Sequence, residues 1–566
     1  MILLVCFLVP VLPDLIAQED EDIRSIVRFM SCDVEDLTDE DIERFSDLLR
    51  HPVRINVVKA PELISTGIFT RYQAASLIDY RSRSGQILSL MELASLDGFG
   101  DDFVERISPF ITLEHYPEYA GKSDNEITAR ASYRASDSNN RYGYAARYKF
   151  RYGEALSASF ALSRSLDSGS ARPDAVCGSV EGRFRSIPLR FVVGDFNARF
   201  GQGLSMWSGV SFTSNTSPSN YMRKASGVTA SSSFTGSNVL TGFAAEYSIR
   251  HYSLSIMLSA PDIKKNSLES GNMNLMPALN FTWLWRNGQA GLSHCLEFRG
   301  LGSGHAAYIP AMKTSMDASA CLSGVDLFSE FVYDWLSRKI SVLGGTVFPV
   351  GEHLDLAALL KTTPDEYAVS VSGSVERCRI VNGNLSAEMI LYPVPKVATQ
   401  DRSLQVKIYS QWQFTLAESL RMTFRLTERL RSWGLLSRTD VRTDVSWSSG
   451  CFLVNARLNG LKCRNVSGLC YVEGGVRMSD ISVYLRQGLF LIDSWDDRIY
   501  VYERDAPGCY NAPAFYGRGV WVSLMTSWKP SRWCRLYLRC GYTCYPFMKE
   551  TKPGKAELRL QSVFDF

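Results

Sequence analysis

Lysine and arginine side chains recur at even spacings in two distant stretches of the chain, and this spacing could bind anions. Alternate residues of a β-strand share one face, so each stretch would place its positive charge on a single face. A pore lined by that face would concentrate anions. The basic positions are Arg147, Lys149 and Arg151 in the first stretch and Lys407, Arg421, Arg425 and Arg429 in the second.

Catalytic and metal-binding patterns are absent from the sequence. The six histidines are dispersed, and neither a His-Glu-x-x-His motif nor a Gly-x-Ser-x-Gly motif occurs. The adjacent Asp496 and Asp497 fall on a segment that reads as a turn, where carboxylates are usually solvated. We therefore expect no enzymatic activity, no metal site and no cofactor.

A period of two governs the chain from about residue 125 to its end. Tyr148, Phe150 and Tyr152 alternate with Arg147, Lys149 and Arg151, and Asn287-Gly288 and Asn382-Gly383 are typical turn signals. No fixed longer repeat accompanies the alternation, which argues against a solenoid. The fold class that we predict is mainly β: an antiparallel transmembrane β-barrel of about 22 to 26 strands, with a small all-α domain before it.

The last strand carries its own signal. Residues 555–566 alternate between an apolar and a charged face, and the chain ends on an aromatic residue. This is typical of the closing strand of an outer-membrane barrel. We interpret Leu558, Leu560, Phe564 and Phe566 as the signal that the barrel-assembly machinery reads.

The chain divides into five predicted segments. Apolar residues 1–16 indicate a signal peptide, for which we predict residues 1–17, because this run is too short to span a bilayer. Apolar residues then recur at helical spacing. The remaining segments are an acidic helical segment at 19–50, a compact helical domain at 51–114, a linker at 115–124 and the barrel at 125–566.

Charge is divided unequally between the two halves. Residues 19–114 hold 20 acidic and 10 basic residues, whereas residues 115–566 hold 38 acidic and 51 basic residues. The acidic domain is thus complementary to the basic barrel, and a barrel this wide needs something to close it. We expect the helical domain to guard the pore. The arginines could instead pair with acids on neighbouring strands or bind lipopolysaccharide phosphates.

Residues 51–114 resemble the helix-hairpin-helix pair of the ComEA competence DNA receptors. The resemblance rests on several blocks: Ala60-Pro61-Glu62-Leu63, Asp79-Tyr80-Arg81, Leu90-Met91-Glu92-Leu93, Gly98-Phe99-Gly100 and Ile107-Ser108-Pro109-Phe110-Ile111. It implies that two tight turns offer backbone N–H groups to DNA phosphates, at Gly67 and Ile68 and at Gly98, Phe99 and Gly100. The first turn departs from the pattern, because Phe69 replaces a glycine and would crowd a phosphate.

The order of the parts resembles a family of outer-membrane proteins of Bacteroidota that are described as helix-hairpin-helix domain-containing. Residues 193–204 and 497–519 are similar to the barrel of that family. The resemblance implies an outer-membrane location, contact with outer-membrane lipids, and a periplasmic amino-terminal domain that docks a protein partner or gates transport or secretion. The alternative is a ComEA-type receptor for DNA uptake, although DNA is disfavoured by the acidic charge of residues 19–114.

Overall fold

The computed structural model describes residues 25–566 except for short gaps. The predicted signal peptide at 1–17 and most of the predicted linker lie outside the described residues. The gaps are residues 33–36, 38, 115–122, 137–139, 154, 185–186, 210–214, 235–237, 250, 261–272, 286, 302–307, 352, 377, 379, 395, 397–401, 435–436 and 549–552.

Residues 25–114 form a helical domain with its own apolar core. Its helices are residues 25–30, α2 (Asp39–Arg50), α3 (Ala60–Ser65), α4 (Arg71–Ser84), α5 (Leu90–Ala94), α6 (Asp101–Ile107) and the 3-10 turn η2 (Ser108–Phe110). Thr70 starts α4 by accepting a hydrogen bond from the N–H of Gln73, whose side chain bonds back to the N–H of Thr70. The parallel pair β1 (Val53–Arg54) and β2 (Ile111–Thr112) joins the segment after α2 to the end of the domain. Phe45 and Phe110 are buried in the core.

The rest of the chain forms a closed β-barrel. Its strands are β3 (Ser123–Ser136), β4 (Arg141–Tyr152), β5 (Leu156–Arg164), β6 (Ala175–Arg183), β7 (Leu189–Arg199), β8 (Gly227–Ala230), β9 (Leu240–Ile249), β10 (Tyr252–Ser259), β11 (Met273–Trp285), β12 (Gly288–Leu301), β13 (Tyr308–Leu322), β14 (Val325–Asp334), β15 (Lys339–Val350), β16 (Leu354–Thr362), β17 (Tyr367–Val375), β18 (Val381–Tyr392), β19 (Ser403–Ala417), β20 (Leu420–Arg431), β21 (Ser437–Ser449), β22 (Phe452–Lys462), β23 (Val466–Arg477), β24 (Ile481–Ile492), β27 (Gly517–Ser531), β28 (Cys534–Cys544) and β29 (Lys555–Asp565). Strand β8 pairs with the last residues of β7, beyond the part that pairs with β9, so 24 of these described strands form the wall. The antiparallel pairing of β29 with β3 closes it.

The wall is apolar outside and polar inside. In β10, Leu254, Ile256 and Leu258 are exposed on the outer surface, whereas Ser253 and Ser255 are buried. A closed barrel with such an outer surface satisfies every wall N–H and C=O group while facing lipid, which is how a sheet crosses an outer membrane. The predicted fold class is confirmed, and the strand number falls within the predicted range.

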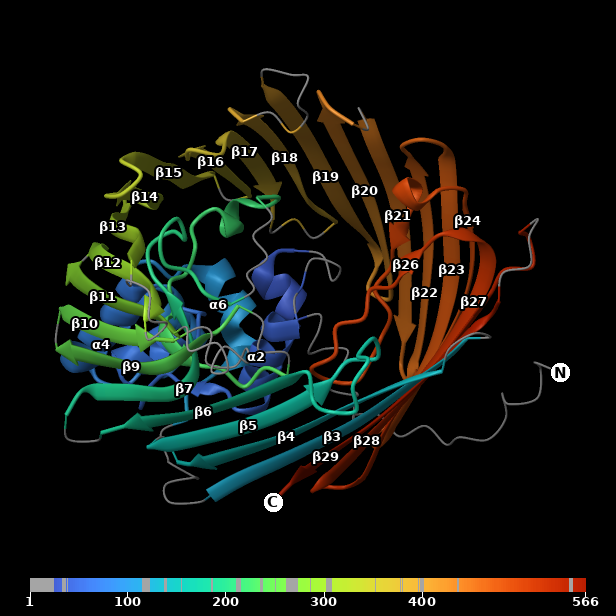
Figure 1. Cartoon of the computed structure of the whole chain (residues 1–566), viewed down its shortest axis with the longest axis horizontal. Coiled ribbons are helices and arrows are strands. Elements are labelled where there is room, and N and C mark those ends of the chain that lie inside the picture. Colours follow the sequence, from blue (N-terminus) through green and yellow to red (C-terminus); the bar gives the residue numbers. More distant parts are fainter. Residues whose placement is uncertain are drawn as a thin grey trace.

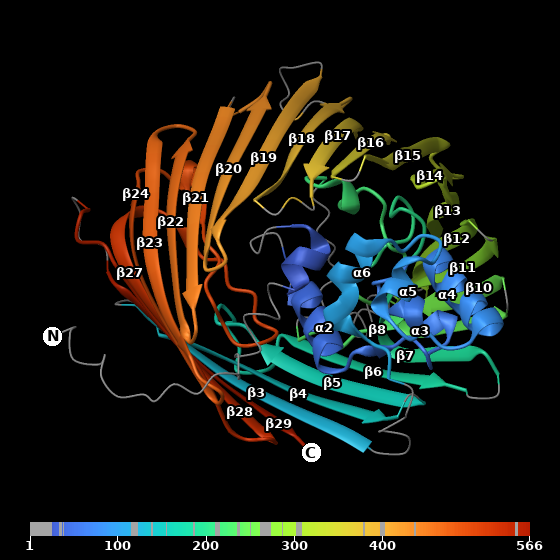
Figure 2. The same ribbon diagram turned by 180° about the vertical axis from the view of Figure 1, so that it is seen from behind.

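The helical domain lies inside the ring of strands, displaced to one side (Figures 1 and 2). Helix α4 packs against β11 and β12, and α3 packs against β8. Two long loops also contribute to the lumen, which we call the first inward loop (residues 200–239, including the 3-10 turn η3, Pro218–Asn220) and the second inward loop (residues 493–516). The second contains the 3-10 turn η4 (Trp495–Asp497) and the strand pair β25 (Ile499–Tyr500) and β26 (Ala514–Phe515). None of the described helices is both long and apolar enough to cross a membrane.

Candidate functional site

The acidic face of α2 meets the basic inner face of β4. Glu43 forms an ion pair with Arg147, and its carboxylate lies 3.4 Å from the ammonium group of Lys149. One turn further along α2, Asp47 lies 3.0 Å from Arg151 and 3.8 Å from Lys149. The helix spacing of four residues and the strand spacing of two bring the carboxylates and cations into register. Three residues of the predicted basic lumen therefore contact the helical domain.

Partial burial strengthens these pairs. The side chains of Glu43 and Arg147 are 12% and 7% exposed, so little water screens them. Burial by itself would raise the pKa of the Asp47 carboxyl, but Lys149 and Arg151 outweigh it and hold that pKa well below its usual range. The carboxylate is thus strongly favoured in its charged form. The guanidinium of Arg147 also lies over the ring of Phe234, in the first inward loop.

Further contacts surround the helical domain. Arg50, at the end of α2, lies 3.0 Å from Glu126 of β3. Glu62 lies 3.4 Å from Arg183 of β6, on the adjoining part of the wall. Across the lumen, Arg106 lies 3.8 Å from Glu376, just after β17. The domain is thus held on several sides by charge.

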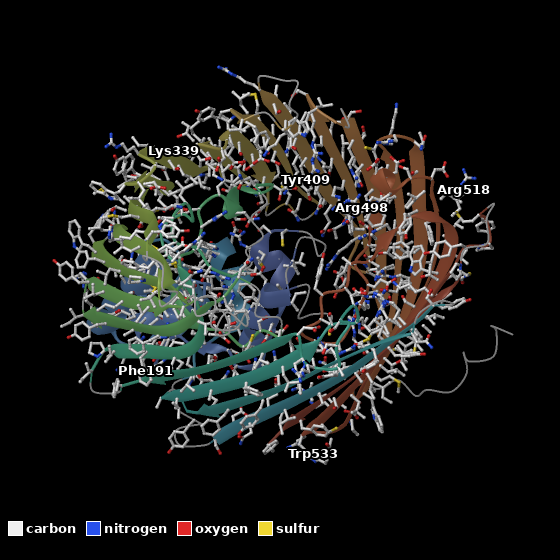
Figure 3. The ribbon with its side chains drawn as sticks, viewed as in Figure 1. Phe191, Lys339, Tyr409, Arg498, Arg518 and Trp533 are labelled. Carbon is white, nitrogen blue, oxygen red and sulfur yellow. The ribbon has the colours of Figure 1, made fainter. Side chains whose placement is uncertain are left out.

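A large cavity separates the helical domain from the opposite wall. Its volume is about 1380 Å³, and its lining includes residues of α6, of strands β18 to β24 and of the second inward loop. Arg421, from the predicted basic lumen, lines it together with Arg457 and Arg486. Tyr409 also lines it and lies on the inner side of β19 (Figure 3).

The other predicted lumen residues lie on the same inner face but outside that cavity. Lys407 is paired in register with Arg429, and Arg429 is paired with Arg438 of the next strand. Arg425 lies 3.8 Å from Asp440. Glu388 lies opposite Lys407 on β18, so cations outnumber carboxylates in this row without being free of them.

A buried ion network holds the second inward loop against the wall. Asp505 is fully buried and pairs with Arg559, and its carboxylate lies 3.8 Å from Arg539. Glu503 pairs with Arg539 as well. Sequence reasoning missed this network, because the long loop has no periodicity. The inward parity of Arg559 was visible and was the only signal for it.

The two glycine turns use their N–H groups within the helical domain. Gly67 donates to Ile64 O, Ile68 to Thr66 Oγ1, Phe99 to Leu96 O and Gly100 to Ala94 O, over 3.0–3.1 Å. The Phe69 ring, expected to crowd a phosphate, is instead fully buried in the core beside Phe99 and Phe103. The predicted DNA contacts stay predictions.

Gly98 is enclosed by its neighbours. Its carbonyl oxygen accepts a hydrogen bond from Gln73 Nε2 at 2.6 Å. A Cβ atom at this position would lie only 1.5 Å from the hydroxyl oxygen of Tyr72, whereas one at Gly100 would meet nothing within 4 Å. Tyr72 therefore covers the approach to the second turn in this structure.

The closing strand, β29, has the outward apolar face that the sequence predicts. Leu558, Leu560 and Phe566 are exposed on the outer surface, and the Phe564 ring stacks on Trp533, with 6.2 Å between centroids. Phe566 exchanges two backbone hydrogen bonds with Asn125, next to the start of the barrel. Recognition of these residues by assembly machinery stays a prediction. The described residues include no group of three or more His, Cys, Asp or Glu side chains placed to hold a metal ion.

No protein-family model matches the chain, and no curated protein matches it. Several solved structures do match the chain. The FrpB iron transporter from Neisseria meningitidis is 8% identical at a TM-score of 0.40, with 78% of this chain and 81% of that chain covered. The siderophore receptor PirA from Acinetobacter baumannii is 7% identical at a TM-score of 0.43, with 79% and 81% covered. The copper transporter OprC is 9% identical at a TM-score of 0.42, with 80% and 82% covered. Similarity at this level assigns no substrate, activity or partner to this chain.

Proposed function

We propose that the helical domain is a removable plug, a gating or docking module that controls passage through an outer-membrane barrel in transport or secretion. The observation that carries the proposal is the pairing of Glu43 and Asp47 with Arg147, Lys149 and Arg151 inside the lumen. In this proposal the pairs hold the domain in the lumen, and breaking them releases the domain while the barrel stays folded. Removal of the domain would expose a basic inner wall that favours anions.

The domain enters the lumen from the periplasm in this proposal. The described barrel chain starts and ends at one rim, because Asn125 pairs with Phe566, and an even number of strands places that rim in the periplasm. Helices α3 and α5 of the helical domain face the viewer in Figure 2. Leu88, just before α5, and Met91, in its first turn, are 80% and 84% exposed. This apolar spot supports docking of a periplasmic protein.

Conductance across a planar bilayer tests the proposal. We expect the full-length protein to conduct poorly and a variant lacking residues 19–114 to form an open channel that prefers anions. Heat-modifiable migration on a semi-native gel confirms that each barrel is folded before it is recorded. Equal conductance of the two proteins, or an open channel without anion preference, contradicts the gate or its selectivity.

A further inference from the structure

A second, smaller cavity lies between the helical domain and the first inward loop. It has a volume of about 130 Å³, roughly ten times the 10–15 Å³ that one water molecule needs. We call it the Lys224 cavity. Its lining consists of Phe29, Met30, Asp41, Arg44, Phe45, Gly67, Phe103, Arg106, Arg199, Trp207, Ser219, Asn220, Met222, Arg223 and Lys224.

The lining has a large excess of positive charge. Arg44 on α2 and Arg106 on α6 come from the helical domain, whereas Arg199, Arg223 and Lys224 come from the end of β7 and the first inward loop. The one carboxylate in the lining is Asp41, which lies 3.4 Å from Arg44. Glu330 of the wall acts on Arg223 from outside the lining. Five cations and one carboxylate thus line this small cavity, and Glu376, which lies 3.8 Å from Arg106, is outside the lining.

The polar groups of this cavity are held beside aromatic rings. Lys224 Nζ lies 4.4 Å from the Phe29 ring centroid and 5.0 Å from that of Phe103. The guanidinium of Arg223 lies 5.1 Å from the Trp207 ring centroid. The indole N–H of Trp207 is buried and has no hydrogen-bond acceptor among the described residues. A buried donor without an acceptor is costly and indicates a missing group.

The surroundings disfavour the charge of Lys224. Burial, and then the nearby Arg106 and Arg44, lower the pKa of Lys224 to about 7. A bound anion would reverse this effect, because it would place negative charge beside Lys224.

We propose that the Lys224 cavity binds a phosphate group, as free phosphate or as a phosphate ester. Guanidinium groups match the geometry of phosphate oxygens, and the ammonium and indole groups add donors from other directions. The cavity is large enough for a tetrahedral anion. Because its cations come from both the helical domain and the barrel, bound phosphate would bridge them.

The first glycine turn contributes to this site. Gly67 lines the cavity, and a Cβ atom there would lie 3.0 Å from Arg44 Nη1. Glycine at this position therefore leaves Arg44 the room to adopt its place in the lining. The first glycine turn would act on the phosphate only through Arg44. The N–H groups of Gly67 and Ile68 already donate hydrogen bonds within the domain.

Isothermal titration of full-length protein with inorganic phosphate tests the inference. We expect saturable binding at one site, weakened at least tenfold in Lys224→Gln and in Arg223→Gln, since each loses a charge-assisted hydrogen bond. Lys224→Arg should retain binding. Arg28→Gln is the control, because Arg28 is an exposed cation of the same domain that pairs with Glu105 and does not line this cavity.

Each outcome of the titration either supports or overturns phosphate binding in the Lys224 cavity. Glycerol 3-phosphate, titrated in parallel, shows whether esters enter as well as the free ion, and binding of either supports the site. No saturable binding of either compound to full-length protein overturns the inference. So does unchanged binding in both glutamine variants, once gel migration shows that they are folded. Because no conductance is measured, the result is independent of the proposed gate.

Discussion

Asp47 of α2 and Arg151 of β4 form an ion pair of 3.0 Å inside the barrel, although 104 residues separate them in the chain. Glu43 and Arg147, one helical turn and four strand residues earlier, form a second pair of the same kind. The two pairs fix α2 along β4. Seating of the helical domain therefore depends on electrostatic attraction at a defined strand, and this dependence can be tested.

Reversing the charge of α2 should release the helical domain. In a Glu43→Lys, Asp47→Lys variant, attraction to Arg147, Lys149 and Arg151 becomes repulsion; breaking the more buried pair alone costs on the order of 3–5 kcal/mol. We expect higher conductance and faster cleavage of the domain by added protease. Asp79→Lys is the matched control, since Asp79 is exposed on α4 and pairs only with Arg83 in the described structure. Similar effects of both variants would contradict a specific role for α2.

Acid should also loosen the domain. The pKa of Asp47 is lowered in the folded protein, so its stabilising contribution is complete above the unfolded value of about 3.9 and is lost as pH falls below it. We expect conductance of the wild type to rise as the pH falls below about 4. Other carboxylates titrate in the same range, so the informative quantity is the difference from Asp47→Asn. That variant should be more open at pH 6 and should respond less to acid.

The second inward loop should depend on its buried ion pair more than on its surface pair. Asp505→Ala leaves Arg559 without its buried partner and removes one of the carboxylates beside Arg539, at a cost on the order of 3–5 kcal/mol. Asp493→Ala removes a half-exposed pair with Arg518, at the base of the same loop, and should change little. The measurement is the temperature at which the folded band disappears on a semi-native gel. Equal loss in the two variants would argue that the network does not hold the loop.

The period of two made the barrel predictable, because it is a local property of each strand. The outward position of Leu558 and the inward position of Arg559 follow from it directly, and both are observed. The basic inner face followed from the same parity. The number of strands could be bracketed since each needs a similar length of chain.

Contacts inside the lumen could not be predicted in the same way. Charge balance suggested that an acidic domain faces a basic barrel, but no pattern assigns Glu43 to Arg147 instead of another cation. The burial of Asp505 depends on how an aperiodic loop folds inward. Tyr72 covers Gly98 only through the packing of α4 on the second turn. These features depend on tertiary structure, and no local periodicity in a single sequence indicates them.

The two glycines of the second turn should respond differently to alanine. Both have positive φ, +83° at Gly98 and +82° at Gly100, so each substitution strains the backbone, by about 1–3 kcal/mol. Only Gly98→Ala also overlaps Tyr72. We expect a larger loss of protease resistance in the helical domain for Gly98→Ala, and recovery of the difference when Tyr72→Ala is added. Equal losses at both positions would contradict the packing of Tyr72 on Gly98.

Full-length protein should bind duplex DNA poorly while the helical domain is seated. The N–H groups of Gly67, Ile68, Phe99 and Gly100 are already bonded within the domain, and Tyr72 covers Gly98. The domain also carries twice as many acidic as basic residues, whereas DNA affinity comes largely from phosphate neutralisation. Fluorescence anisotropy at two salt concentrations measures the affinity of the full-length protein for duplex DNA.

Micromolar binding that weakens steeply with salt would restore the ComEA-type receptor as the better interpretation, on condition that Gly98→Ala reduces it. Binding that Gly98→Ala leaves unchanged would come from the basic barrel, because the second turn is then not the contact. The helical domain would in that case still act as a plug, and the phosphate proposed for the Lys224 cavity would be unrelated to DNA.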